Sequence, residues 1–193
     1  DAPVAVDDTF AGDEDAQIAG NVLFNDTDAD TGDTLTVSLA SDVSNGTLVL
    51  NANGSFTYTP DANFNGADSF SYTVNDGTVD GTTATVTLTI SGVNDAPGGA
   101  DATIALDEDG SRSFAATDFG FSDPDAGDSL QAVRIDTLPG AGALQLNGID
   151  VTAGQVIAAT DLGNMVFAPA ANANGASYAN FTFSVQDSAG ALD

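Results

Sequence analysis

The sequence contains an internal duplication, and this repeat constrains the possible folds more than any other feature. Three landmarks recur in the same order: Asp-Ala-Pro at 1–3 and 95–97, Asp-Glu-Asp around Glu14 and Glu108, and Asp-x-Asp at 28–30 and 123–125. Independent matches in one order are the signature of repeated structural units. We therefore predict two units, residues 1–97 and 98–193, each close to the usual size of a domain.

Within each unit the hydrophobic pattern has a period of two, which is typical of β-strands. Residues 84–90 alternate Ala-Thr-Val-Thr-Leu-Thr-Ile, and the stretch 70–74 places Phe, Tyr and Val on one face. Asn53-Gly54 and Asn147-Gly148 are hairpin signals between such segments. Short, turn-separated strands of this kind predict an all-β protein made of two tandem Greek-key β-sandwiches.

The two predicted sandwiches differ at their ends. In the first unit a long alternating strand, residues 82–91, follows the loop that contains Asp76, whereas six residues follow the matching Asp187. We therefore expect the second sandwich to lack its last strand, which leaves one edge of a sheet unpaired.

The charge of the chain excludes several classes of function. The sequence has 29 acidic residues against two arginines, a formal net charge of −27, and neither histidine nor cysteine. Such a surface repels nucleic-acid phosphates. Histidine-based catalysis, thiol nucleophiles, structural zinc and disulfides are excluded by composition, so we expect no enzyme. The sequence has no apolar run of 18 residues, so we expect no insertion into a membrane.

The acidic residues are almost all aspartates, since Glu14 and Glu108 are the two glutamates. A solvated acidic surface is one interpretation, but adaptation to salt would raise glutamate as readily. Aspartate is short and favours turns, so it suits loops that converge on a cation. The stretch 26–37 is not an EF-hand loop, because its glycine comes one place late and its twelfth residue is valine.

The expected loops of the sandwich gather the acidic side chains at its two poles. In the first unit, we expect Asp28, Asp30 and Asp76 to meet at one pole, and Glu14 and Asp61 at the other. Joining the units end to end would add residues of the linker and of the second unit to this second group: Asn94, Asp95, Asp123, Asp125 and Asp187. Such crowding favours a divalent cation, and Ca²⁺ accepts six to eight oxygen ligands with loose geometry whereas Mg²⁺ demands an octahedron.

These motifs resemble a known family. Thr-Asp-Ala-Asp at 27–30, Val-Asn-Asp-Gly at 74–77 and Val-Asn-Asp-Ala-Pro at 93–97 are similar to the motif series of cadherin repeats. More closely, both units resemble the cadherin-like or immunoglobulin-like tandem repeats of large bacterial surface adhesins of the biofilm-associated and RTX type. The resemblance implies seven-stranded sandwiches with calcium at their junctions. Glu14, Asn94, Asp95, Asp123, Asp125 and Asp187 would be ligands, while Asp61 is the nearest match to the Asp-Arg-Glu element of cadherins.

The resemblance implies a mechanical function. We expect a secreted, calcium-rigidified spacer at a bacterial cell surface, whose partners are the adjacent repeats of the same polypeptide and calcium. One alternative is a calcium-dependent module that binds carbohydrate or another ligand. Another is a filament subunit, because the open sheet edge of the second unit could accept a strand from a neighbouring chain.

Overall fold

The computed structural model describes residues 1–175 and 178–193. Contacts divide the chain into two compact units, Asp1–Val93 and Asn94–Asp193. The linker residues Asn94-Asp95-Ala96-Pro97, which the sequence placed in the first unit, belong with the second. No helix within the two described ranges is long and apolar enough to cross a membrane.

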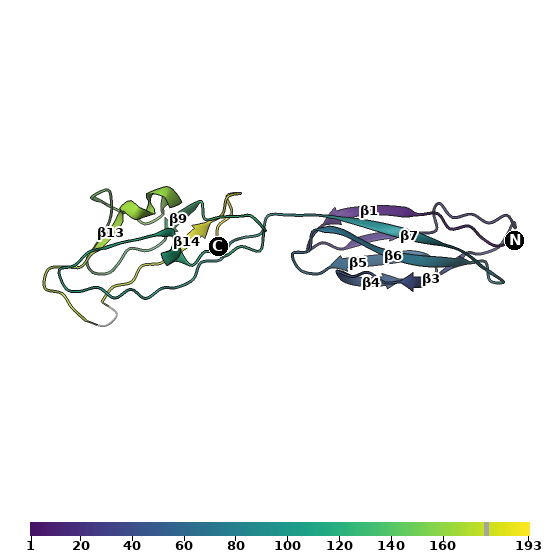
Figure 1. The fold of residues 1–193 in the computed structure, drawn as a ribbon, viewed down its shortest axis with the longest axis horizontal. Helices are drawn as coiled ribbons and strands as arrows, with labels where there is room; N and C mark the ends of the chain where they lie inside the picture. Colours follow the sequence, from purple (N-terminus) through teal and green to yellow (C-terminus); the bar gives the residue numbers. More distant parts are fainter. Residues whose placement is uncertain (176–177) are drawn as a thin grey trace. The chain divides into compact units, whose positions relative to one another are not determined.

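The first unit is a seven-stranded β-sandwich (Figure 1). One sheet has the order β1-β7-β6-β3 and the other has the order β2-β5-β4. Strand β1 pairs in parallel with β7, and the remaining pairs are antiparallel. The strands are β1 (Asp8–Asp13), β2 (Ile18–Asn21), β3 (Thr36–Ser41), β4 (Gly46–Leu50), β5 (Ser55–Pro60), β6 (Gly66–Asn75) and β7 (Asp80–Ser91).

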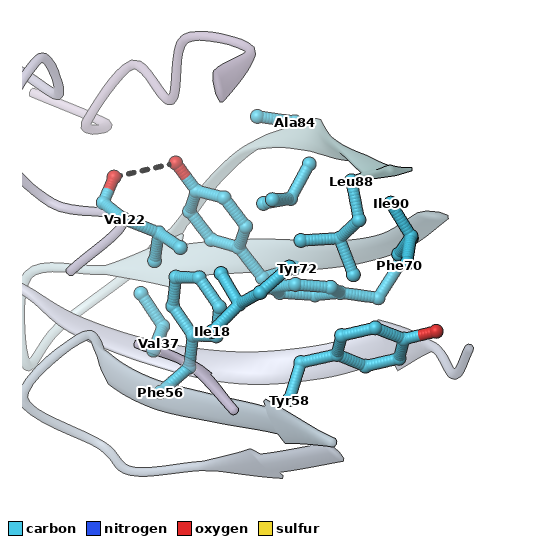
Figure 2. Close-up of a cluster of buried hydrophobic side chains, with 11 residues drawn as sticks. Ile18, Val22, Val37, Phe56, Tyr58, Phe70, Tyr72, Ala84, Leu88 and Ile90 are labelled. Atoms are coloured by element: carbon cyan, nitrogen blue, oxygen red, sulfur yellow. Dashed lines mark hydrogen bonds between the residues drawn. The ribbon is translucent and has the colours of Figure 1, made fainter. Parts of the chain in front are cut away.

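Alternation along the two longest strands builds the core of the first unit (Figure 2). The aliphatic residues of β7 are buried while the threonines between them face solvent. Strand β6 contributes Phe70, Tyr72 and Val74, all at most 1% exposed. Phe56 of β5 packs edge-on against Phe70, with ring centroids 5.4 Å apart. The period-two prediction for these segments is confirmed.

The second unit is a sandwich of shorter strands with two 3₁₀ helices. Its sheets have the orders β11-β10-β13-β8 and β12-β9-β14. Its elements are β8 (Arg112–Ser113), η1 (Ala116–Phe119), β9 (Ala132–Ile135), β10 (Ala143–Leu146), β11 (Ile149–Asp150), β12 (Gln155–Ala158), η2 (Ala159–Asn164), β13 (Met165–Ala168) and β14 (Phe183–Gln186).

Local turn chemistry explains one hairpin of the second unit. Asn147 and Gly148 join β10 to β11, and both have positive φ angles, 53° and 77°. This is the backbone of a two-residue turn whose twist matches that of the flanking strands. In the first unit Asn53-Gly54 lies instead in a longer connection, which runs from the end of β4 to the start of β5. A hydrogen bond from Gly54 N to Asn51 O closes this turn.

The last strand of the first unit has a much shorter counterpart in the second. Strand β14 pairs with β9 along one edge. At its other edge Leu192 bridges Gln186, and Asp193 N donates to Val185 O. These contacts lie where β7 pairs with β6 in the first unit, and no regular strand follows β14 among the described residues, as expected.

Candidate functional site

Three aspartates of the first unit meet at the pole where β6 turns into β7. Carboxylate oxygens of Asp28, Asp33 and Asp76 all lie within 4.8 Å of one another. Asp28 and Asp33 belong to the connection between β2 and β3, while Asp76 follows β6. Gly32, with φ of +109°, supplies the left-handed turn before Asp33. The cluster therefore joins two connections that are distant in sequence.

The two oxygens of Asp28 differ in their surroundings. Oδ1 accepts a hydrogen bond from Asp30 N at 2.8 Å. Oδ2 is buried and has no hydrogen-bond partner among the described residues. A buried carboxylate oxygen without a donor is costly, so this atom marks a place where a cation would stabilise the fold.

Asp76 is held by its own turn. Oδ1 accepts hydrogen bonds from Thr78 N at 2.6 Å, Thr78 Oγ1 at 2.7 Å and Val79 N at 2.8 Å. These donors, the Val79 amide foremost, lower the pKa of Asp76 below its ordinary value. The carboxylate is therefore ionised at neutral pH.

The second unit repeats the cluster at the matching positions. Carboxylate oxygens of Asp123, Asp128 and Asp187 lie within 4.8 Å of one another. Asp123 Oδ1 accepts from Asp125 N at 2.9 Å, while Oδ2 is buried without a hydrogen-bond partner in the described part of the chain. Gly127, with φ of +105°, takes the place of Gly32. The duplication has thus preserved both the acidic residues and the turn that brings them together.

Asp187 is the most enclosed member of this second cluster, with a side chain that is 0% exposed. Its Oδ1 accepts hydrogen bonds from Gly190 N and Ala191 N. Its Oδ2 accepts one from Asn94 Nδ2 at 2.8 Å. The Asn94 amide is the largest influence that lowers the pKa of Asp187, so this carboxylate too is ionised at neutral pH.

The linker residues are bound to the acidic pole of the second unit. Asn94 Nδ2 also donates to Asp95 O at 2.9 Å, and Asp95 N donates to Asp125 Oδ2 at 2.7 Å. The two hydrogens of the Asn94 amide are therefore both used. Its carbonyl oxygen is left to act as an acceptor or a ligand.

Glu14 lies at the opposite pole of the first unit and is 3% exposed. Its Oε1 accepts from Val93 N at 2.7 Å, and Asn65 Nδ2 donates to Oε2 at 3.4 Å. Asp61 is exposed in the turn after β5, and that turn contacts the Glu14 turn through Asn63 N and Asp15 Oδ1, 3.3 Å apart. Both acids thus lie at the expected pole, with Glu14 fixed to the last residue of the unit.

The first cluster contains Asp33 where the sequence predicted Asp30. Asp30 lies beside it in the same turn, where its backbone amide donates to Asp28 Oδ1. Sequence reasoning missed Asp33 and its equivalent Asp128 as candidate ligands. The signal that could have identified them is the Gly-Asp dipeptide that follows both Asp-x-Asp pairs.

The donor set of both clusters suits a hard cation. Every candidate ligand atom is an oxygen, and the buried Oδ2 atoms of Asp28 and Asp123 supply free electron pairs. Calcium prefers such ligands and tolerates irregular geometry. The bound ion would supply positive charge that neutralises carboxylates which otherwise repel one another.

Comparison with known families identifies both units. Residues 1–92 match the model of a bacterial cadherin-like domain, and residues 94–193 match the model of a bacterial Ig domain. The chain belongs to the bacterial Ig domain family, whose model covers more than half of it, and its first unit is similar to a bacterial cadherin-like domain. In this tandem of a cadherin-like and an Ig domain, the aspartate clusters lie at equivalent poles of the two members.

The chain is also similar to several solved structures at low sequence identity. Human CDH23 EC21-23 is 18% identical with a TM-score of 0.52, and the match covers 97% of this chain and 64% of that one. Protocadherin gammaB7 EC3-6 is 15% identical with a TM-score of 0.49, over 96% and 47%. The endo-fucoidan hydrolase MfFcnA9 from glycoside hydrolase family 107 is 20% identical with a TM-score of 0.35, over 46% and 15%.

The cadherin–Ig tandem spans 15–64% of the length of these solved chains. No curated protein sequence matches it. The likeness to CDH23 supports the sandwich fold alone.

Proposed function

We propose that this tandem is a calcium-rigidified spacer in a large bacterial surface adhesin, which holds a binding domain away from the cell. The supporting observation is the repeated aspartate cluster, Asp28-Asp33-Asp76 in one unit and Asp123-Asp128-Asp187 in the next. A catalytic site is a single asymmetric arrangement, whereas a feature repeated in each module fits a role in joining modules.

Electrostatics support a bound cation. Two like charges about 4 Å apart repel by about 1 kcal/mol even at the dielectric constant of water, and more where water is excluded. Each cluster brings together three carboxylates in a protein whose formal net charge is −27. A divalent ion converts this repulsion into attraction and stabilises the folded form that binds it.

In this proposal the junction between repeats is the mechanical element. Glu14, Asp61, Asn94, Asp95, Asp123, Asp125 and Asp187 would share calcium ions between adjacent repeats, which are the partners of the chain. Extracellular calcium modules have dissociation constants of about 10⁻⁴–10⁻³ M. The sites would therefore be empty in the cytosol and filled outside the cell, so that the spacer stiffens only at the cell surface.

Small-angle scattering with calcium and with chelator tests the spacer function. We expect chelation to broaden the distribution of distances between the units and to lower the melting temperature. The matched control is Asp123→Asn/Asp187→Asn, which should scatter in calcium as the wild type does in chelator. Identical wild-type profiles in both conditions would contradict the rigid spacer.

A second candidate function, strand acceptance, is favoured by the edge of β14. A hollow of about 1040 Å³ in the second unit is lined in part by Phe114, Phe119 and Phe183. A strand from a neighbouring chain, running antiparallel to β14, would extend this sheet and build a filament. Light scattering of the purified protein tests this candidate, since a mass that stays monomeric at high concentration would exclude it.

A further inference from the structure

The hydroxyl of Tyr72 connects the core of the first unit to its acidic pole. The Tyr72 side chain projects from the middle of β6 and is 0% exposed. Figure 2 shows its hydroxyl pointing out of the hydrophobic cluster toward the carbonyl oxygen of Val22, to which it donates at 2.9 Å. Val22 begins the connection that carries Asp28 and Asp33.

The same hydroxyl contacts Asp26, two residues before Asp28. The distances from Tyr72 Oη to the two carboxylate oxygens of Asp26 are 3.1 and 3.0 Å. Asp26 Oδ1 also accepts a hydrogen bond from Val6 N at 2.8 Å. The connection is thus attached both to β6 and to the segment that precedes β1.

The surroundings of Tyr72 are rich in acceptors. Besides Val22 O and Asp26, the carbonyl oxygen of Val6 and Oδ2 of Asp8 each lie 3.4 Å from Tyr72 Oη. A hydroxyl has one proton to donate. This proton therefore lies among several oxygen atoms. Removal of the hydroxyl group would leave Val22 O and the Asp26 carboxylate facing the edge of a buried ring.

The second unit lacks this hydroxyl. Phe183 stands at the position of Tyr72, two residues before the matched valine, and packs edge-on against Phe119 with ring centroids 4.9 Å apart. Phe119 ends η1, just before the loop that contains Asp123.

Both acidic loops share a backbone bridge just before the first cluster aspartate, Val4 with Thr27 in the first unit and Gly98 with Ser122 in the second. The tyrosine hydroxyl adds hydrogen bonds to the acidic loop of the first unit, where the second unit has a phenylalanine.

We propose that Tyr72 is a positioning residue for the cation site of the first unit. Its hydroxyl holds the start of the acidic connection so that Asp28 and Asp33 face Asp76 before any ion arrives. Without this contact the three carboxylates would move apart. Binding of the ion would then have to compensate for the conformational entropy that the loop loses when it closes. This inference rests on the proposed binding of calcium.

Tyr58 supplies a matched control for Tyr72. It is also 0% exposed, and its hydroxyl donates to Asn45 O at 2.9 Å and lies 3.1 Å from Asp68 Oδ2. None of these groups belongs to the acidic connection. Tyr72→Phe and Tyr58→Phe each remove one buried hydroxyl from the same core, so they separate positioning of the loop from general loss of stability.

The experiment is a calcium titration of the full chain followed by amide NMR. Gly32 and Gly77 report on the first cluster, while Gly127 and Gly190 report on the second within the same molecule. We expect Tyr72→Phe to raise the calcium midpoint of Gly32 and Gly77 by about two- to tenfold, the loss of one hydrogen bond. The midpoints of Gly127 and Gly190 should not change, and Tyr58→Phe should leave all four unchanged.

A second measurement does not depend on calcium. In chelator, hydrogen exchange at the amides of Val6 and Asp30 should be faster in Tyr72→Phe than in Tyr58→Phe, because both amides donate to aspartates of the held segment. Asp26→Ala should reproduce both effects, and the double variant Asp26→Ala/Tyr72→Phe should be little worse than either single variant, since the two act through one contact.

Three results would overturn the inference. Equal calcium midpoints in Tyr72→Phe and Tyr58→Phe would show that the hydroxyl does not position the loop. A loss of affinity in Asp26→Ala without one in Tyr72→Phe would make Asp26 itself a ligand. Wild-type Gly32 and Gly77 signals that ignore calcium would contradict the proposed function as well, which distinguishes the two failures.

Discussion

The side-chain amide of Asn94 donates to the buried carboxylate of Asp187 at 2.8 Å, which joins the start of the second unit to the turn after β14. Asn94→Ala removes this donor and leaves Asp187 Oδ2 without that partner. We expect the second unit to melt at a lower temperature in chelator, as followed by calorimetry. Asn174→Ala, whose amide lies 3.4 Å from exposed Glu108, is the control that should change little.

Because Asp28 and Asp123 each have a buried carboxylate oxygen, we expect their replacement by asparagine to shift the melting temperature in opposite directions with and without calcium. In chelator, Asp28→Asn or Asp123→Asn relieves repulsion of about 1 kcal/mol, so the variant should melt above the wild type. In millimolar calcium the same variant loses a charged ligand and should melt below it. Thermal unfolding in both conditions checks this reversal.

Asp42→Asn is the control for that reversal, because Asp42 is exposed and its Oδ1 accepts from the neighbouring amide of Val43. It should behave alike with and without calcium. Destabilisation of Asp28→Asn and Asp123→Asn in chelator would show that the acidic clusters are not under electrostatic strain.

The hydrogen bonds of Asp68 lead us to expect that the first unit loses stability in acid. Burial alone would raise the pKa of Asp68, but hydrogen bonds from the Ser44, Asn45 and Ser69 amides and from Tyr58 outweigh it and lower that pKa below its ordinary value. A lowered pKa contributes stability above the unfolded-state value of about 3.9, and this contribution is lost as the pH falls through the folded-state pKa.

Denaturant unfolding between about pH 2 and pH 5 measures this effect. Asp68→Asn should lower the free energy of unfolding at pH 7 by about 1–3 kcal/mol and should flatten its dependence on pH below about 4. An equally steep acid profile in the variant would assign the acid sensitivity to other carboxylates.

We expect replacement of Gly20 by a larger residue to disturb packing in the first unit. A Cβ atom at this position would lie 2.4 Å from Phe10 Cε1 and 2.8 Å from Phe56 Cε1, between two rings whose centroids are 4.8 Å apart. We expect Gly20→Ala to destabilise the first unit by about 1–3 kcal/mol. Gly163→Ala, where a Cβ would meet no atom within 4 Å, is the control for calorimetry.

The division into two units follows from the sequence because the same landmarks recur in the same order. The strands follow from it because their signals are local. Side chains of a strand alternate between its faces, so the Thr-aliphatic run at 84–90 is enough to identify β7 and its buried side. The Asn147-Gly148 turn is likewise specified by two adjacent residues that tolerate positive φ.

Tertiary structure decided which acidic residues meet. Asp30 and Asp33 are both near Asp28 in sequence, yet it is Asp33, after the turn at Gly32, that joins Asp28 and Asp76 in the cluster. That outcome depends on how the connection is attached to the sandwich, including the Tyr72 hydroxyl on a strand more than 40 residues away. A list of aspartates names the candidate ligands, but the convergence of side chains from distant loops requires the closed sandwich, because only its packed core fixes the distances between them.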